Sequence, residues 1–130
     1  MKFNFDNNIP IYIQLVEQLT LYIVSGKIQS GERLPSVRDL ALKTKVNPNT
    51  MQKALVELEE KKLIYTESTN GKFVTTDKKL IDKFKKSYAD ELTKKYFIGM
   101  ESLGFDKDEI LNYLKEYGGN KWWNLWNVLT

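Results

Sequence analysis

The chain has no cysteine and no histidine among its 130 residues. Disulfides, Fe–S clusters, zinc sites built from Cys and His, and nucleophiles that need a histidine base are therefore excluded. A carboxylate-bound Mg²⁺ or a lysine nucleophile stays open at this point. No stretch approaches the roughly 20 apolar residues that cross a bilayer, and the N-terminus MKFNFDNNIP lacks the apolar core of a signal peptide. We therefore expect a cytoplasmic protein that does not enter a membrane.

The chain also lacks a large excess of charge of one sign, because its formal net charge is only +3. The positive charges are nevertheless concentrated. Between residues 33 and 53 the acid Asp39 is outnumbered by five cations: Arg33, Arg38, Lys43, Lys45 and Lys53. Such a stretch indicates a side that faces a polyanion, although a plain solvated helix face would look the same.

The N-terminal part contains two recognisable helix starts. Pro10 suits the first turn of a helix, and an apolar stripe at helical spacing continues to a stop near Gly26. The turn before Leu34-Pro35 leads into a second, short helix, for which Ser36 is the N-cap and Asp39 completes a capping box.

A third helix follows after a few residues. Asn47 is a good N-cap and Pro48 occupies the first helical position. Its inward face is expected to consist of four apolar residues: Met51, Ala54, Leu55 and Leu58. Two short helices joined by a tight turn, the second opening with polar residues, predict a helix-turn-helix.

Two short strands are expected next, at residues 63–66 and 73–76, separated by the hairpin signal Asn70-Gly71. A hairpin directly after a helix-turn-helix defines a winged helix, which we assign to residues 1–76. The fold class is therefore mainly α with a small β-hairpin.

Residues 77–130 are expected to form a short all-helical C-terminal region. A long amphipathic helix from Leu80 ends at Gly104, and Asp106 with Glu109 opens another capped helix. Gly118-Gly119 is expected to break the chain before a final short helix that carries Trp122 and Trp126.

The motifs of residues 8–76 resemble the GntR family of bacterial regulators. Gly31–Ala41 (GERLPSVRDLA) resembles the start of the family's DNA-binding domain, and Val46–Leu55 (VNPNTMQKAL) resembles the recognition helix of its YtrA-like branch. Pro10–Leu15 and Gly71–Val74 resemble the opening of the first helix and the wing. Members commonly carry glycine where this chain has Lys62, so we expect the third helix to end differently or with a small strain.

The resemblance implies a DNA-binding transcription regulator, a repressor that acts as a homodimer on an inverted repeat and without a cofactor. In the YtrA-like branch, the regulated operons often encode ABC transporters. The resemblance is also compatible with an unidentified small-molecule effector. Such an effector would change the angle between the two DNA-binding domains and the helical C-terminal region. An enzyme is not expected, since no Gly-rich phosphate loop is present and capping explains Asp106 and Glu109 better than a metal does.

Candidate DNA contacts gather around the third helix and the wing. Amide side chains at Asn49 and Gln52 can pair with adenine, and Thr50 can reach phosphate or a thymine methyl group. The resemblance assigns guanine readout to Arg38. Backbone or wing contacts are expected from the remaining candidates: Arg33, Ser36, Asn47, Lys53, Gly71 and Lys72.

Structural alternatives stay open for several of these residues. Arg38 could pair with a carboxylate of its own chain, Asn49 could serve only as a local hydrogen-bond partner, and Lys72 could be ordinary surface charge. The alternative function is a winged-helix module that binds a protein partner, which predicts little salt-dependent affinity for double-stranded DNA.

The long apolar stripe of the tail cannot be covered by a small winged helix alone. We therefore expect a two-fold interface between copies. The candidate interface residues are Phe84, Tyr88, Leu92, Tyr96, Trp122 and Trp126. For the tryptophans, an intramolecular core and an aromatic cage that captures a quaternary amine are the alternatives.

Overall fold

The computed structural model describes residues 1–121. Trp122 and Trp126, with the final helix expected around them, lie outside these residues. The described chain is mostly helical with one two-stranded antiparallel hairpin, so the predicted fold class is confirmed. The elements are α1 (Ile11–Val24), α2 (Val37–Thr44), α3 (Pro48–Glu60), β1 (Ile64–Thr66), β2 (Lys72–Val74), α4 (Lys78–Ser102) and α5 (Lys107–Glu116).

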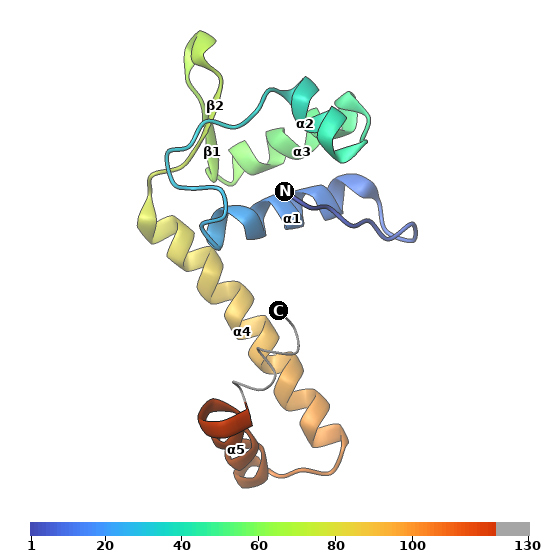
Figure 1. Cartoon of the computed structure of the whole chain (residues 1–130), viewed down its shortest axis with the longest axis vertical. Helices are drawn as coiled ribbons and strands as arrows, with labels where there is room; N and C mark the ends of the chain where they lie inside the picture. The colour runs from blue at the N-terminus through green and yellow to red at the C-terminus, as the bar shows by residue number, and fades with distance from the viewer. Residues whose placement is uncertain (122–130) are drawn as a thin grey trace. The chain divides into compact units, whose positions relative to one another are not determined.

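The chain divides into two compact units, Met1–Lys86 and the part that starts at Ser87. In the first unit, α1 and α2 both pack against α3, and the β1–β2 hairpin extends past these helices (Figure 1). A single cluster of fifteen buried apolar residues fills the space between them, with Leu15, Leu40 and Leu55 fully buried. This arrangement is the winged helix that the sequence predicts.

Capping side chains fix the starts of α2 and α3. The Ser36 hydroxyl accepts the Asp39 N–H at 3.1 Å, and the Asn47 amide oxygen accepts the Asn49 N–H at 2.8 Å. Between the two helices, Lys45 adopts a left-handed conformation with φ of 58°. The chain can therefore reverse within a few residues, which makes the turn of the helix-turn-helix short.

The hairpin forms where it was predicted, but its turn is longer than Asn70-Gly71. The register pairs Ile64 with Val74, and a 3-10 turn at Ser68–Asn70 separates the strands. Gly71 has φ of 105°, a region that favours glycine, and Ser68 also has a positive φ. The sequence identified the glycine correctly and missed the extra turn before it.

A third extended segment pairs with β2, and the sequence analysis did not predict it. Arg33 forms an isolated antiparallel bridge with Phe73. The Leu34 N–H donates to the Lys72 carbonyl at 2.8 Å, and the Val74 N–H donates to the Glu32 carbonyl at 2.9 Å. The residues before α2 are therefore tied to the hairpin.

The end of α3 confirms the expectation about Lys62. The helix ends at Glu60, and Lys62 then adopts φ of 64°. A side chain with a Cβ is strained in this left-handed region, where glycine is not.

Residues before Pro10 also belong to the first unit, which the sequence analysis did not foresee. The Gln14 side chain donates to the carbonyls of Asp6 and Ile9 and accepts the Asp6 N–H. Phe3 and Phe5 pack against the core. The N-terminal segment is thereby held along α1.

In the second unit, α5 begins with the predicted capping box between Asp106 and Glu109. The expected break at Gly118-Gly119 is wrong, because a π-helical turn at Tyr117–Lys121 carries the chain directly on from α5. No helix among residues 1–121 is sufficiently long and apolar to span a membrane.

Candidate nucleic-acid interface

The first turn of α3 presents the amide side chains that the sequence selected. Asn49 and Gln52 are exposed, and Thr50 is half-buried. Asn47 is exposed as well, although its amide oxygen is occupied by the cap to the Asn49 N–H. The Asn49 backbone is thus used for capping, while its side chain stays available for a base edge.

The packing of α3 explains this exposure. Met51, Ala54, Leu55 and Leu58 are all fully buried, and their spacing places them on one side of the helix. Gln52 and Lys53 then lie on the opposite side. The helix is therefore oriented by its own apolar face.

Arg38 lies in the first turn of α2 and is exposed. Within residues 1–121, no ion pair of its guanidinium with Asp39 or with an acid of α3 is found. Ser36, just before it, uses its hydroxyl as a helix cap. The Arg38 side chain is thus exposed and makes no ion pair with these acids, as a base-reading or phosphate-binding arginine requires.

Lys53 has a neighbour that the sequence analysis missed. Its ammonium group lies 3.9 Å from the centroid of the Tyr12 ring, which α1 contributes. A cation over an aromatic face is attracted by the ring quadrupole, and Lys53 is still exposed. Tyr12 therefore holds the ammonium group of Lys53 near α1. Only a three-dimensional structure reveals this contact between residues 41 positions apart.

The wing is tied to α3 through Lys72. Its ammonium group donates to the Thr66 hydroxyl at 2.9 Å and lies 3.9 Å from a carboxylate oxygen of Glu59. The Thr66 hydroxyl in turn donates to the same oxygen of Glu59. Lys72 is half-buried in this network. It therefore attaches the wing to α3 and is more than an ordinary surface charge.

Arg33 lies across the glycine of the wing. A Cβ at Gly71 would meet the Arg33 Nε at 3.1 Å, which is closer than a side chain usually allows. Arg33 is itself exposed. The absence of a side chain at Gly71 therefore lets a guanidinium lie against the hairpin.

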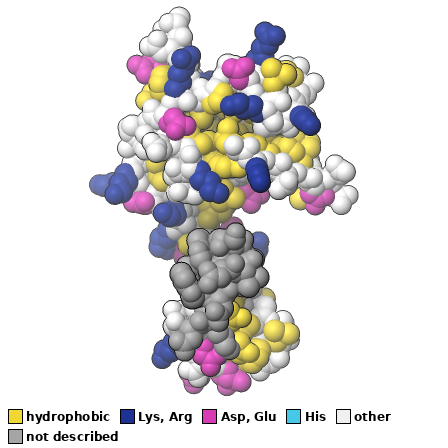
Figure 2. Space-filling view, in the orientation of Figure 1, with side chains coloured by type: hydrophobic (Ala, Val, Ile, Leu, Met, Phe, Trp, Pro, Cys, Tyr) yellow, Lys and Arg dark blue, Asp and Glu magenta, His cyan; other side chains and the backbone are white. Residues whose placement is uncertain are grey.

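Basic and acidic side chains are interspersed on the surface of the first unit (Figure 2). Figure 2 shows Lys and Arg side chains projecting from several places on the first unit, around a central hydrophobic area. Among residues 1–121, no group of three or more metal-ligating side chains could hold a metal ion. The first unit thus combines the exposed amides of Asn49 and Gln52 with exposed cations, among them Arg38 and Lys53.

The described candidates for the dimer interface lie in different environments. Phe84 is half-buried and packs against the core of the first unit. Tyr88 and Tyr96 are half-buried on α4, and Leu92 is 67% exposed. In α4 no residue is fully buried.

A winged helix with an exposed, polar recognition helix defines a class of DNA-binding regulators. The family described as bacterial regulatory proteins, gntR family, matches residues 11–74. The HTH-type transcriptional regulator YhcF of Bacillus subtilis is 32% identical over 90% of this chain and 97% of its own. YtrA of the same organism, an HTH-type transcriptional repressor, is 32% identical over 82% of this chain and 83% of its own.

Solved structures of similar proteins are also DNA-binding regulators. A GntR family transcriptional regulator from Listeria monocytogenes has a TM-score of 0.77 at 41% identity, covering 86% of this chain and 98% of its own. The DNA-binding domain of AraR in complex with operator ORX1 has a TM-score of 0.53 at 26% identity, covering 58% of this chain and 96% of that one. The chain belongs to the GntR family of DNA-binding transcriptional regulators, and its homologues include YtrA.

Proposed function

We propose that two copies of this protein bind an inverted-repeat operator and repress transcription by blocking the polymerase. The observation that carries the proposal is the start of α3, where Asn49 and Gln52 are exposed. Arg38 of α2 is exposed as well and forms no ion pair within residues 1–121. Such a turn fits the major groove, where bidentate amide and guanidinium contacts distinguish bases. The relative YtrA is named a repressor, which supports the sign of the effect.

Each candidate residue has a role in this proposal. Asn49 and Gln52 read adenine, Arg38 reads guanine, and Thr50 contacts a phosphate or a thymine methyl group. The positioning contacts to the backbone come from Arg33, Ser36, Asn47, Lys53, Gly71 and Lys72. The winged helix is accordingly the DNA-binding domain, proposed to span residues 1–76.

We infer the second copy from the exposed apolar residues of the C-terminal region, which we propose to span residues 77–130. Leu92 lies on α4, Leu103 follows directly after the last residue of this helix, and both are about 70% exposed. An exposed apolar surface of this kind is normally covered. A two-fold interface there would present two winged helices to two half-sites. We extend the proposal to an operon that encodes an ABC transporter, as the resemblance to the YtrA-like branch implies.

Selection of duplexes from a random pool with the purified full-length protein tests the proposal. We expect an enriched inverted repeat, and an affinity for it that falls steeply with salt because phosphate counterions are released. A matched duplex with one scrambled half-site should bind more weakly. Selection of no sequence, together with a flat salt dependence, would favour a module that binds a protein partner instead.

A further inference from the structure

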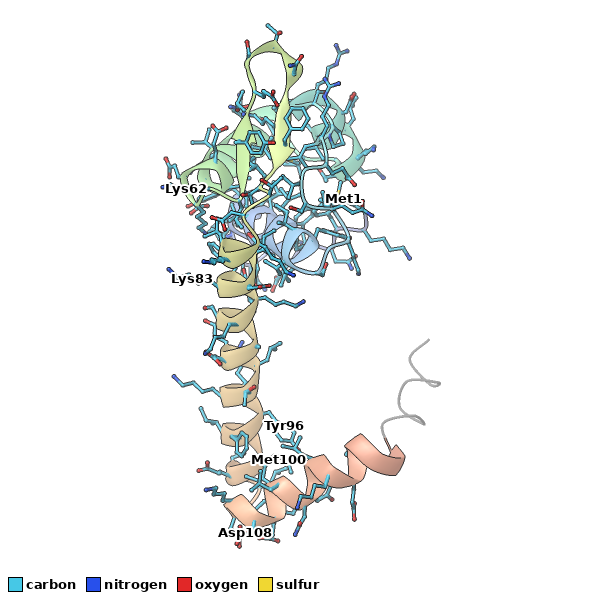
Figure 3. The ribbon with its side chains drawn as sticks, turned by 90° about the vertical axis from the view of Figure 1, so that its left-hand side faces the viewer. Met1, Lys62, Lys83, Tyr96, Met100 and Asp108 are labelled. Atoms are coloured by element: carbon cyan, nitrogen blue, oxygen red, sulfur yellow. The ribbon has the colours of Figure 1, made fainter. Side chains whose placement is uncertain are left out.

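The second unit contains a pocket that DNA binding does not use. Its volume is about 470 Å³, within the range of small-molecule sites. It lies between the C-terminal end of α4, where Figure 3 labels Tyr96 and Met100, and α5. The lining residues are Tyr96, Met100, Leu103, Phe105, Tyr113, Leu114 and Tyr117.

Aromatic side chains dominate this lining. Four of the seven lining residues carry phenyl or phenol rings, and the rings of Phe105 and Tyr113 meet edge to face at 5.3 Å between centroids. The face of an aromatic ring carries negative electrostatic potential, which attracts a cation, and the Met100 thioether is polarizable. The pocket therefore suits an apolar molecule with a diffuse positive charge.

Acidic side chains line the neighbouring depression. This second hollow, of about 320 Å³, is lined by Phe105, Glu109, Asn112, Tyr113 and Glu116, so it shares Phe105 and Tyr113 with the pocket. Among the lining residues within the described part of the chain, neither hollow has a lysine or an arginine. Figure 2 shows acidic side chains beside hydrophobic ones at this end of the unit. The two hollows thus combine an apolar wall with negative charge.

We propose that this site binds a lipophilic organic cation, with its apolar body between the tyrosines and its positive charge toward Glu109. Of the two exposed leucines offered to a second copy, Leu103 lines the pocket and Leu92 does not. A second copy that covers Leu92 alone is therefore compatible with a ligand in the pocket, whereas one that also covers Leu103 would compete with the ligand. The proposal goes beyond DNA recognition and stands independently of it.

Two ions of the same shape and opposite charge test the site. We would titrate tetraphenylphosphonium and tetraphenylborate into the full-length protein without DNA, using calorimetry. The cation should bind at least about tenfold more tightly, because the anion meets the same apolar wall but the wrong charge. Equal affinities, or no binding of the cation, would overturn the proposal and leave the proposed operator binding untouched.

Charge variants on one helical turn locate the binding. Glu109→Gln removes the charge but keeps the helix cap, because glutamine also serves at this position of a capping box. Its matched control is Asp108→Asn, an exposed acid that lines neither hollow. We expect several-fold weaker binding of the cation in Glu109→Gln only. An equal loss of cation binding in both variants would mean that the acids attract the cation only through their general charge, and it would refute the proposed site.

A second copy is the competing occupant of the pocket. If it fills the pocket, the apparent affinity for tetraphenylphosphonium must fall as the protein concentration rises. An affinity that is independent of protein concentration, together with the Glu109→Gln effect, is the result that the proposal predicts. A dependence on protein concentration would overturn it in favour of the second copy.

Discussion

The two units of this protein use apolar residues in opposite ways. The first unit buries a cluster of fifteen apolar residues, and Leu15, Leu40, Met51 and Leu55 have no exposed surface. In the second unit, among residues up to 121, Ile110 is the buried apolar side chain. Leu92, by contrast, is 67% exposed. The first unit is stabilised by its own buried core, whereas the second leaves apolar side chains exposed that a partner or a ligand could cover.

Sequence periodicity alone does not reveal this difference. Both units contain helices with apolar stripes and proper caps, and the capping box of α5 is more complete than the cap of α2. What differs is the number of elements that converge on each stripe. Three helices and a hairpin enclose the core of the first unit, while α4 and α5 leave a pocket between them.

The largest expected effect is on the core of the first unit. Leu55→Ala should lower the free energy of unfolding by about 2–5 kcal/mol, because a fully buried leucine leaves a cavity. Leu92→Ala should change it by less than about 0.5 kcal/mol in dilute protein. Urea denaturation checks both variants, and similar losses would remove the contrast between the units.

The next effect concerns the surface of the second unit. Leu92→Glu should raise the dissociation constant of the proposed dimer by at least about 100-fold, since the interface would lose one leucine contact per copy and bury a charge. Ile98→Glu is the control, because Ile98 is equally exposed but lies on another side of α4. Sedimentation equilibrium measures the change. An unaltered dimer in Leu92→Glu would place the interface elsewhere.

A smaller effect tests how the first unit reads DNA. Arg38→Ala should reduce the preference for the selected operator over random DNA by about 1–3 kcal/mol, the cost of a lost base contact. Lys43→Ala removes the same charge from the same helix and should weaken both duplexes alike. Fluorescence anisotropy at fixed salt provides the affinities. A preserved preference in Arg38→Ala would refute base readout by this residue.

The smallest effect concerns the strained backbone after α3. Lys62→Gly should stabilise the first unit by up to about 1 kcal/mol, because glycine adopts φ of 64° without steric cost. Lys61→Gly should destabilise it, since Lys61 already has a right-handed helical conformation. Thermal unfolding distinguishes the two. A lower melting temperature in both variants would show that left-handed strain at Lys62 is negligible.

Much of the first unit could be predicted because its signals are local. Asn47-Pro48, Ser36 and Gly71 each act through neighbouring backbone atoms, so the sequence located α2, α3 and the hairpin. The same reasoning failed at Gly118-Gly119, where a low helix propensity did not prevent a π-helical turn.

Three contacts of the candidate interface that sequence reasoning missed join distant residues. Tyr12 meets Lys53, Glu59 meets Lys72, and Arg33 pairs with Phe73. None of these pairs has a spacing rule, because each depends on how two separate elements are packed. Charge counting found the cations of this face but could not assign their partners.

By itself, the sequence determined where the helices begin, where the hairpin turns and which side of α3 is polar, because caps, glycines and helical periodicity act over a few residues. Only the tertiary structure decided that Lys72 is bound to Glu59, that Arg33 lies against Gly71, and that aromatic and acidic side chains meet beside α5. These arrangements follow from the packing of whole elements against one another, and packing is fixed by the complete set of side chains rather than by any short segment.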